Sequence, residues 1–227
     1  MAVLNNYAYV VNHMAQLHVV DTSVVDSPQL AGTVDLVSNV SPSPRPYQIS
    51  ETQVQDIATD GNFVYVALRE LYQQPNTNGV GQLNVIDVRV PSMPTVLSTI
   101  RTGNPEPKGV AINGDFVYLW KCGFLLVYDM SDPTQPVETK SIFRGACETT
   151  GGEMDIQGDH MFMAMGDQGF EYWDVSDPAN PTYVSAHQEV NDDARFVAAN
   201  GDLLYVSHNT SAVSYTHLRA HETSLHL

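Results

Sequence analysis

Basic residues are scarce in this sequence. Ten Lys and Arg stand against 26 Asp and Glu, which gives a formal net charge of −16. A surface with this excess of negative charge repels nucleic-acid phosphates and anionic lipid headgroups, so we expect no nucleic-acid partner. No apolar run approaches the roughly 20 residues that a membrane-spanning helix needs. We therefore expect no direct membrane insertion in this segment.

Cysteine is nearly absent, because Cys122 and Cys147 are the two in the chain. Two cysteines allow one disulfide, two free thiols or an incomplete metal site, and their spacing does not choose among these. Common enzyme signatures are missing too: there is no G-x-S-x-G elbow, P-loop, H-E-x-x-H or G-x-G-x-x-G. These absences count against several familiar enzyme classes and leave the metal content open.

What the sequence does contain is one unit repeated five times. Each copy begins with a turn and an aromatic, β-branched strand, and four copies continue with a strand that ends at an Asp and leads into another turn. Gly supplies the positive φ of the first turn, and Pro fixes φ after the second. The first element lies at 5–10, 60–67, 113–120, 157–164 and 200–207, and the second at 17–21, 83–88, 125–136 and 170–181.

Each complete repeat predicts four short antiparallel strands. In the third repeat we expect them at 108–112, 116–121, 124–130 and 136–143. Residues four and two positions before the repeated Asp are apolar, so this side should face inward, whereas the varied residue between them should be less strictly buried. Four-stranded units repeated radially are the blades of a β-propeller. A β-sandwich of irregular strands is the alternative, but it does not explain five aligned copies.

The motifs resemble the LVIVD repeat of bacterial and archaeal surface-associated propellers. The likeness rests on the Gly-Asp-aromatic-Val-Tyr strand, the apolar strand that ends in Asp, and the Ser-Asp-Pro-x-x-Pro turns at 131–136 and 176–181. It covers about residues 2–208, and the first two repeats lack the complete Ser-Asp-Pro-x-x-Pro. The resemblance implies a propeller, often on exported or envelope-attached proteins. It implies no general activity and supplies no catalytic residues.

We expect an all-β chain with about four complete propeller blades and a partial fifth over residues 1–210. The first repeat enters inside its inner strand at Ala2, and the fifth stops after Ser207. The segment is therefore expected to be a fragment of a larger propeller. Residues 211–227 break the repeat, and from Ser214 they resemble translated sequencing-adapter read-through. We expect this tail to be an artefact or disordered.

Long insertions are expected on one face of the propeller. Loops from the second to the third strand, and from the fourth strand to the next blade, open on the same side, and the insertions at 38–52 and 69–81 both fall there. We call this side the long-loop face. Binding residues concentrate in such loops, although simple surface decoration explains the insertions equally well. Cys122 and Cys147 also belong to this face, where a disulfide between them would fit an oxidising compartment.

The first residues of the inner strands should line the central channel with mixed charges. Converging carboxylates there could hold Ca²⁺, bind a polar small molecule, or act as the acid and base of a hydrolase or lyase. A wet, polar channel without a ligand is the plain alternative. Asp155 stands where other repeats have Ala58, Ala111 and Ala198. The candidate ligand-binding residues are Asp56, Lys108, Glu153, Asp155, Asp193 and Arg195.

The sequence favours a non-catalytic binding or scaffold module. We expect a protein or glycan partner at the long-loop face and a location outside the cell or in the cell envelope. The alternative function is a hydrolase or lyase that uses the channel carboxylates. No residue is identified as catalytic, and no cofactor is expected apart from the Ca²⁺ considered above.

Overall fold

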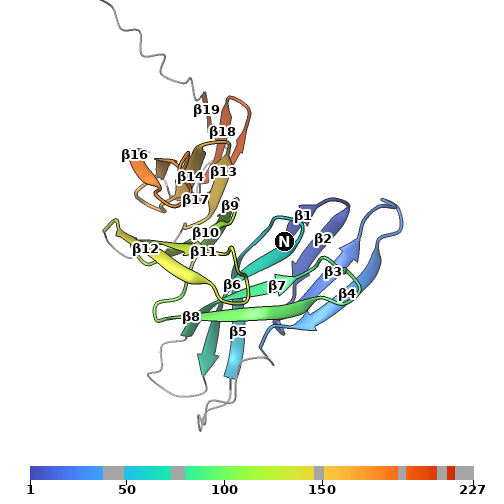
Figure 1. The fold of residues 1–227 in the computed structure, drawn as a ribbon. Coiled ribbons are helices and arrows are strands. Elements are labelled where there is room, and N and C mark those ends of the chain that lie inside the picture. Colours follow the sequence, from blue (N-terminus) through green and yellow to red (C-terminus); the bar gives the residue numbers. More distant parts are fainter. Residues whose placement is uncertain (38–48, 73–79, 146–150, 189–192, 209–213, 218–227) are drawn as a thin grey trace, which may run out of the picture. The chain divides into compact units, whose positions relative to one another are not determined.

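A computed structural model describes residues 1–37, 49–72, 80–145, 151–188, 193–208 and 214–217. All regular secondary structure in these ranges is β-strand, and every sheet is antiparallel (Figure 1). The chain divides into two compact units, Met1–Cys147 (unit 1) and Glu148–Leu227 (unit 2). Each unit is described by itself.

Unit 1 contains three four-stranded sheets, and each is a meander in chain order. They are the first three propeller blades. The first blade comprises β1 (Ala2–Leu4), β2 (Tyr7–Val11), β3 (Gln16–Asp21) and β4 (Gln29–Asp35). The second comprises β5 (Ile49–Thr59), β6 (Phe63–Tyr72), β7 (Val80–Asp87) and β8 (Thr95–Gly103). The third comprises β9 (Gly109–Asn113), β10 (Phe116–Lys121), β11 (Phe124–Asp129) and β12 (Val137–Phe143), close to the predicted bounds.

Unit 2 contains a fourth four-stranded blade and a three-stranded sheet. The fourth blade comprises β13 (Met154–Gln157), β14 (His160–Ala164), β15 (Phe170–Asp174) and β16 (Thr182–His187). The last sheet comprises β17 (Ala194–Asn200), β18 (Leu203–His208) and β19 (Ser214–His217). β19 pairs with β18 in the place of a third blade strand, although it lies in the segment expected to be a non-repeat tail. Residues 218–227 lie outside the described part.

The Asp that ends the third strand of each complete blade caps the following turn. Asp129 Oδ1 accepts a hydrogen bond of 2.8 Å from the Ser131 N–H, and the next residue, Met130, donates its N–H to the Asp115 carbonyl at 2.7 Å. This bond fastens the turn to the neighbouring hairpin. Hydrogen bonds from Ser131 lower the pKa of Asp129. The same side-chain bond recurs at Asp21, Asp87 and Asp174, at 2.8, 3.0 and 2.9 Å.

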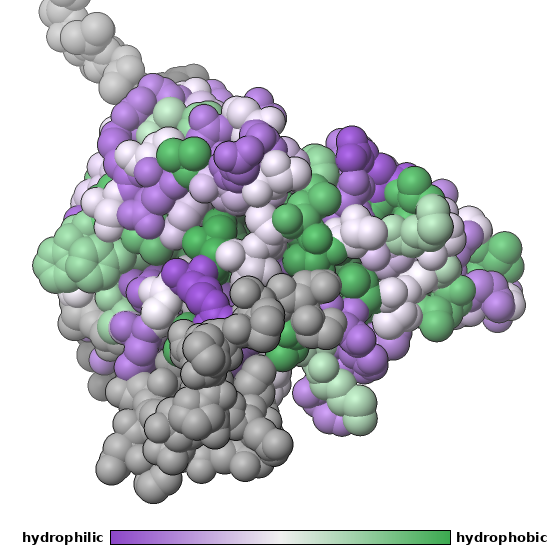
Figure 2. All heavy atoms as spheres, turned by 60° about the horizontal axis from the view of Figure 1, so that its bottom comes forward, coloured by the Kyte–Doolittle hydropathy of each residue, from purple (hydrophilic) through white to green (hydrophobic). Residues whose placement is uncertain are grey.

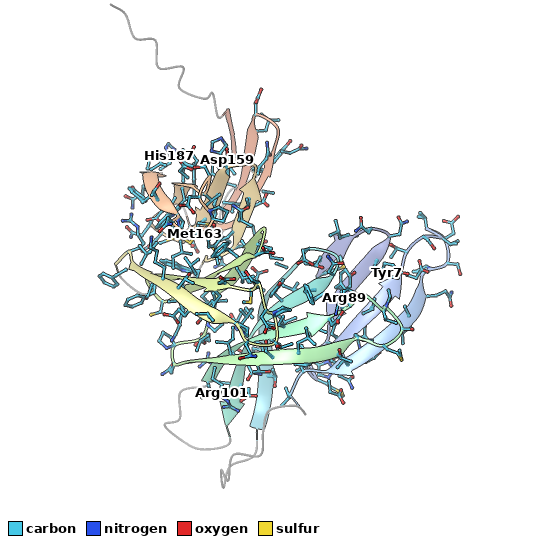
Figure 3. The ribbon with its side chains drawn as sticks, viewed as in Figure 1. Tyr7, Arg89, Arg101, Asp159, Met163 and His187 are labelled. Atoms are coloured by element: carbon cyan, nitrogen blue, oxygen red, sulfur yellow. The ribbon has the colours of Figure 1, made fainter. Side chains whose placement is uncertain are left out.

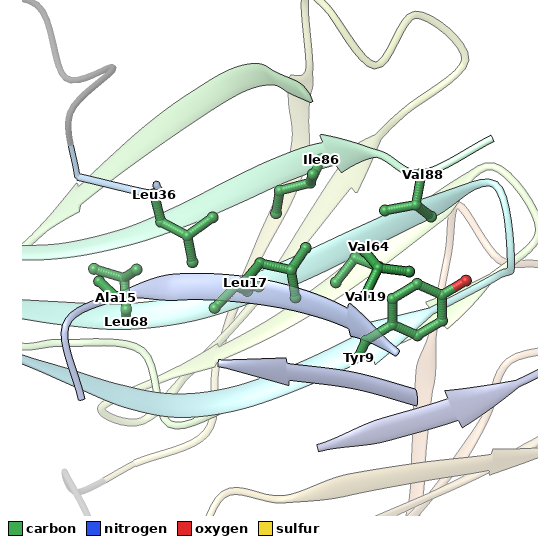
Figure 4. Close-up of a cluster of buried hydrophobic side chains, with 10 residues drawn as sticks. Tyr9, Ala15, Leu17, Val19, Leu36, Val64, Leu68, Ile86 and Val88 are labelled. Atoms are coloured by element: carbon green, nitrogen blue, oxygen red, sulfur yellow. The ribbon is translucent and has the colours of Figure 1, made fainter. Parts of the chain in front are cut away.

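The apolar strand positions form the core as expected. Leu17 and Val19 of β3 are fully buried against Val64 and Leu68 of β6, so one hydrophobic cluster joins the first two blades (Figure 4). In three of the four blades the opposite side of the third strand is more buried than expected, because Asn84, Leu126 and Glu171 are 0%, 8% and 5% exposed. Asn84 shares its side of β7 with Ile86, which belongs to that cluster, so both faces of the second blade are covered.

In unit 1 the turn after the third strand also joins the second blade to the first and the third blade to the second. The Ser98 hydroxyl on β8 donates to the Pro133 carbonyl of the third blade at 2.7 Å. Gly32 takes the equivalent place on β4, since Gly32 pairs with Val19 as Ser98 pairs with Val85. A Cβ at Gly32 would lie 2.7 Å from Pro94 Cδ of the second blade. Pro-containing turns therefore serve as contacts between blades.

Candidate functional site

Asp56 lies on the inner strand β5 and bonds to the next blade. Its Oδ1 accepts from the Ile57 N–H at 2.8 Å, and its Oδ2 accepts from the Val110 N–H of β9 at 2.8 Å. Burial raises the pKa of Asp56 to about 6, and the hydrogen bonds from Val110 and Ile57 oppose this increase in part. The carboxylate thus joins the second and third blades.

Asp155 repeats this arrangement in unit 2. Its Oδ1 accepts from the Ile156 N–H at 2.9 Å, and its Oδ2 accepts from the Ala199 N–H of β17 at 2.6 Å. Asp155 pairs with Phe162 as Ala58 pairs with Tyr65, which confirms the expected equivalence to the alanines of other repeats. The substitution of Asp for Ala gives this blade a side-chain bond to the next one.

Arg195 and Asp193 lie together at the start of β17. The Arg195 Nε and Nη2 atoms are each 3.3 Å from Asp193 Oδ2, and both side chains are partly exposed. Glu153 precedes β13, and its backbone carbonyl accepts from the Ala164 N–H at 2.9 Å. Among the described residues, no group of three or more His, Cys, Asp or Glu side chains has the arrangement of a metal site. The described residues therefore provide no set of ligands for the Ca²⁺ ion considered above.

Lys108 belongs to a charged cluster at the loop end of the second and third blades. Its Nζ lies 2.9 Å from Glu106 Oε1, and Arg69 Nη1 lies 3.4 Å from the same oxygen. Burial would raise the pKa of Glu106, but its own backbone N–H, the hydrogen bond from Lys108 and the charges of Lys108 and Arg69 lower it overall. Lys121 donates to the Thr102 carbonyl, and burial lowers the pKa of Lys121.

Sequence reasoning found Lys108 and missed its neighbours. Glu106 lies in the short connection between β8 and β9, which packs closely on β7: a Cβ at Gly81 would lie 2.8 Å from Glu106 Cα and 2.7 Å from Thr102 Oγ1. Arg69 stood within a supposed loop insertion, but it belongs to β6, which continues to Tyr72. The run of β-forming and apolar residues through 63–72, which continues past Arg69 to Leu71 and Tyr72, is the signal that could have found it.

Both predicted insertions, 38–52 and 69–81, include residues that belong to strands. β6 ends at Tyr72 and β7 begins at Val80, while β5 begins at Ile49. Residues 38–48 and 73–79 lie outside the described part of the chain. Gly81 pairs with both Arg69 and Gly103, so the β6–β7 hairpin and the start of the β8–β9 connection lie at the same end of the sheet. Figure 2 shows strongly hydrophilic and apolar side chains close together on the surface.

Cys122 occupies the tight turn between β10 and β11. It is disulfide-bonded, whereas Cys147 lies outside the described residues. Cys122 and Gly123 have φ values of 41° and 79°. Positive φ at both central residues is the pattern of a type I′ hairpin turn. The Gly123 carbonyl accepts from the Arg144 N–H at 2.7 Å, which extends the pairing of β11 with β12.

The sequence profile of the LVIVD repeat matches residues 1–36, 52–72, 106–143 and 152–188. The chain belongs to the LVIVD repeat family. The matched segments of this LVIVD-repeat protein contain the first, third and fourth blades, including their capped turns, and the first hairpin of the second blade. No curated protein matches the sequence. Within the described residues, no helix has the length and apolar character needed to cross a membrane.

Solved structures with the same kind of fold share little sequence with this LVIVD-repeat protein. The computationally designed Ika4 protein aligns with a TM-score of 0.53 and 12% identity, over 74% of this chain and 92% of the designed one. A chain of the mitotic checkpoint complex aligns with a TM-score of 0.64 and 14% identity, over 95% of this chain. The match spans 62% of that checkpoint chain. These identities support the fold alone.

Proposed function

We propose that this protein is a non-catalytic binding or scaffold module whose partner, a protein or a glycan, docks on the long-loop face. One observation carries the proposal. Asp56 and Asp155, two of the four channel carboxylates that could serve a hydrolase or lyase as acid or base, each use both carboxylate oxygens to accept backbone N–H bonds. A carboxylate occupied in this way is poorly placed to exchange a proton with a substrate.

The charged cluster supports the long-loop face as the docking surface. Arg69 and Lys108 have side-chain exposures of 27% and 23%, so both reach the surface at the end where the loops lie. Elsewhere the acidic carboxylates of the repeat cap turns within their own blades. Charged side chains that a partner can reach are therefore present at the loop end of the second and third blades.

We also propose a location outside the cell or in the cell envelope. The disulfide at Cys122 supports this, because disulfides persist in oxidising compartments and are rare in the cytosol. The family resemblance to surface-associated propellers points the same way.

The test presents the purified chain to an array of oligosaccharides and peptides, and each bound member is then assayed for cleavage. The expected result is saturable binding without product. Binding should be lost when residues 38–48 and 73–79 are replaced by Gly-Ser linkers of equal length. It should persist in Val25→Ser, which alters a side chain that is 87% exposed in a turn at the other end of the first blade. Cleavage that disappears in Asp56→Asn or Asp155→Asn would overturn the proposal.

A further inference from the structure

Four side chains form a row across the loop end of the third blade. Lys121 pairs with Phe124, and Phe124 pairs with Phe143. Lys108 donates its backbone N–H to the Trp120 carbonyl at 2.8 Å, which sets it beside Lys121. We call Lys108, Lys121, Phe124 and Phe143 the cation–aromatic row. It crosses all four strands of the sheet, with two cations at the inner end and two rings at the outer end.

The row lies on one side of the sheet. Side chains alternate along a strand, so Lys121 shares its side of β10 with Leu119, and Phe124 shares its side of β11 with Leu126. Both leucines belong to the hydrophobic cluster between the second and third blades. The row therefore continues the side that faces the second blade, at the end where Arg69 and Glu106 also lie.

The inner end of the row has more positive than negative charge. Arg69 and Lys108 share one oxygen of Glu106, and Lys121 donates to a backbone carbonyl. Glu106 forms salt bridges with Arg69 and Lys108; burial lowers the pKa of Lys121, and the charge of Glu138 opposes this lowering. Two lysines side by side on neighbouring strands repel each other, which an anion between them would relieve. Three cations close together are unusual in a chain whose formal charge is −16.

The outer end of the row is apolar and exposed. Phe124 and Phe143 are 39% and 64% exposed, and their ring centroids lie 5.0 Å apart with the planes inclined by 49°. Inclined rings form an apolar notch that suits a branched side chain, whereas a sugar ring stacks best on a flat aromatic face. The turn that separates Lys121 from Phe124 is fixed by its positive φ values and by the disulfide at Cys122. The two ends of the row therefore keep a fixed spacing.

We propose that the cation–aromatic row binds an extended acidic peptide segment of a partner protein, with a carboxylate at Lys108 and Lys121 and an aliphatic side chain at Phe124 and Phe143. This inference deepens the proposed function and rests on it. Adjacent strands are about 4.8 Å apart, so the row spans about 14 Å. An extended peptide advances about 3.3 Å per residue and returns to the same side every second residue, so acidic and aliphatic residues four positions apart fit the row.

The overall charge argues against other anionic partners. The 26 acidic residues of this protein repel a polyanion at each of its charges, whereas a peptide with one carboxylate at the cations is repelled less. Nonspecific attraction of anions to this protein is weak for the same reason. An acidic peptide that binds must therefore depend on these particular side chains.

The test is an NMR titration of the ¹⁵N-labelled full chain with the peptide Gly-Glu-Ser-Gly-Ser-Leu-Gly, blocked at both ends. Matched peptides carry Gln for Glu or Ser for Leu. The variants are Lys108→Met, Lys121→Met and Phe143→Ser. Their controls are Arg89→Met, at the other end of the second blade from Arg101 (Figure 3), and Phe196→Ser, which removes a ring that is 58% exposed in unit 2.

We expect saturable shifts at the row and about tenfold weaker binding in either lysine variant, because each loses a charge-assisted hydrogen bond. Phe143→Ser and both altered peptides should also bind several-fold more weakly, and the two controls should match the wild type. Equal binding by all variants, or no shifts at the row, would overturn the inference. If array ligands still bind without cleavage in that case, the proposed binding function stands. If they are cleaved, the proposed function itself fails.

Discussion

The Oδ2 atom of Asp155 accepts a hydrogen bond of 2.6 Å from the N–H of Ala199, and this bond links the inner strands of two consecutive sheets. Asp56 and Val110 form the same link at 2.8 Å between two other blades. In a propeller the N–H groups of an inner strand that face the channel lack a strand partner. A carboxylate from the preceding blade satisfies one of them and strengthens the contact between blades.

Replacement of Asp155 by Ala should destabilise unit 2, although Ala is what other repeats carry at this place. The Ala199 and Ile156 N–H groups would lose their acceptor, and such losses cost about 1–3 kcal/mol. Urea denaturation measures the change in the free energy of unfolding. Asp202→Ala, which alters an exposed turn residue next to β18, is the control and should have little effect. Equal stability of Asp155→Ala and the wild type would show that the bond is unimportant.

Asp56 should make stability depend on pH between about 4 and 6. Burial raises its pKa from 3.8 to about 6, so the folded state binds this proton more tightly than the unfolded state does. Stability from this group is therefore highest below pH 4, falls as the pH rises through 6, and stays lower above it. The difference between the two pKa values corresponds to about 3 kcal/mol.

The Asp56→Asn variant removes this titration. Relative to the variant, the wild type should lose stability as the pH rises from 4 to 7, as measured by urea denaturation at several pH values. Asp129 should change the stability with pH in the opposite direction, because hydrogen bonds from Ser131 lower its pKa. Asp129→Asn should therefore remove stability that the wild type has above pH 4 and loses in acid. Parallel pH profiles of the wild type and Asp56→Asn would contradict the expectation.

Gly32→Ala should weaken the contact between the first two blades more than Ser98→Ala weakens the next one. The new Cβ would lie 2.7 Å from Pro94 Cδ, so either strand or turn must shift, at a cost of about 1–3 kcal/mol. Ser98→Ala removes one hydrogen bond without a steric clash, which costs about 1 kcal/mol. Chemical denaturation of both variants gives the comparison. A neutral Gly32→Ala would show that the turn adapts freely.

The disulfide at Cys122 should protect both thiols from alkylation. The unreduced chain should take up no iodoacetamide by mass spectrometry, and the reduced chain should take up two groups, because the sequence holds two cysteines. Reduction should lower the free energy of unfolding by about 2–4 kcal/mol. Alkylation without prior reduction would contradict the disulfide, and with it the main support for an oxidising location.

The sequence was sufficient to predict the blades because two short-range signals repeat in it. Gly in the hairpin turns and Asp at the end of each third strand determine where strands begin and end, and the capped turn at Asp129 shows why that Asp recurs. The alternation of Leu83 and Val85 correctly gave the buried side. The burial of Asn84 could not be predicted, because it depends on the neighbouring blade and not on its own strand.

The sequence indicated where some of the candidate site residues lie, but it did not indicate which groups they contact. Asp155 stood out because it replaces Ala, yet its partner is a backbone N–H 44 positions later, which no local pattern reveals. Glu106 and Arg69 lie 37 positions apart and meet through the packing of the β8–β9 connection on Gly81. Long-range pairs of this kind depend on how blades stack, which the repeat pattern does not specify in detail.

The most direct test of the account is amide hydrogen exchange at Val110 and Ala199, measured by NMR on the full chain. If the inner-strand carboxylates serve as acceptors between blades, both amides exchange slowly in the wild type. Val110 should then become fast in Asp56→Ala, and Ala199 in Asp155→Ala, while added Ca²⁺ changes neither. Rapid exchange of both amides in the wild type would contradict the account and return these carboxylates to the channel as candidates for catalysis.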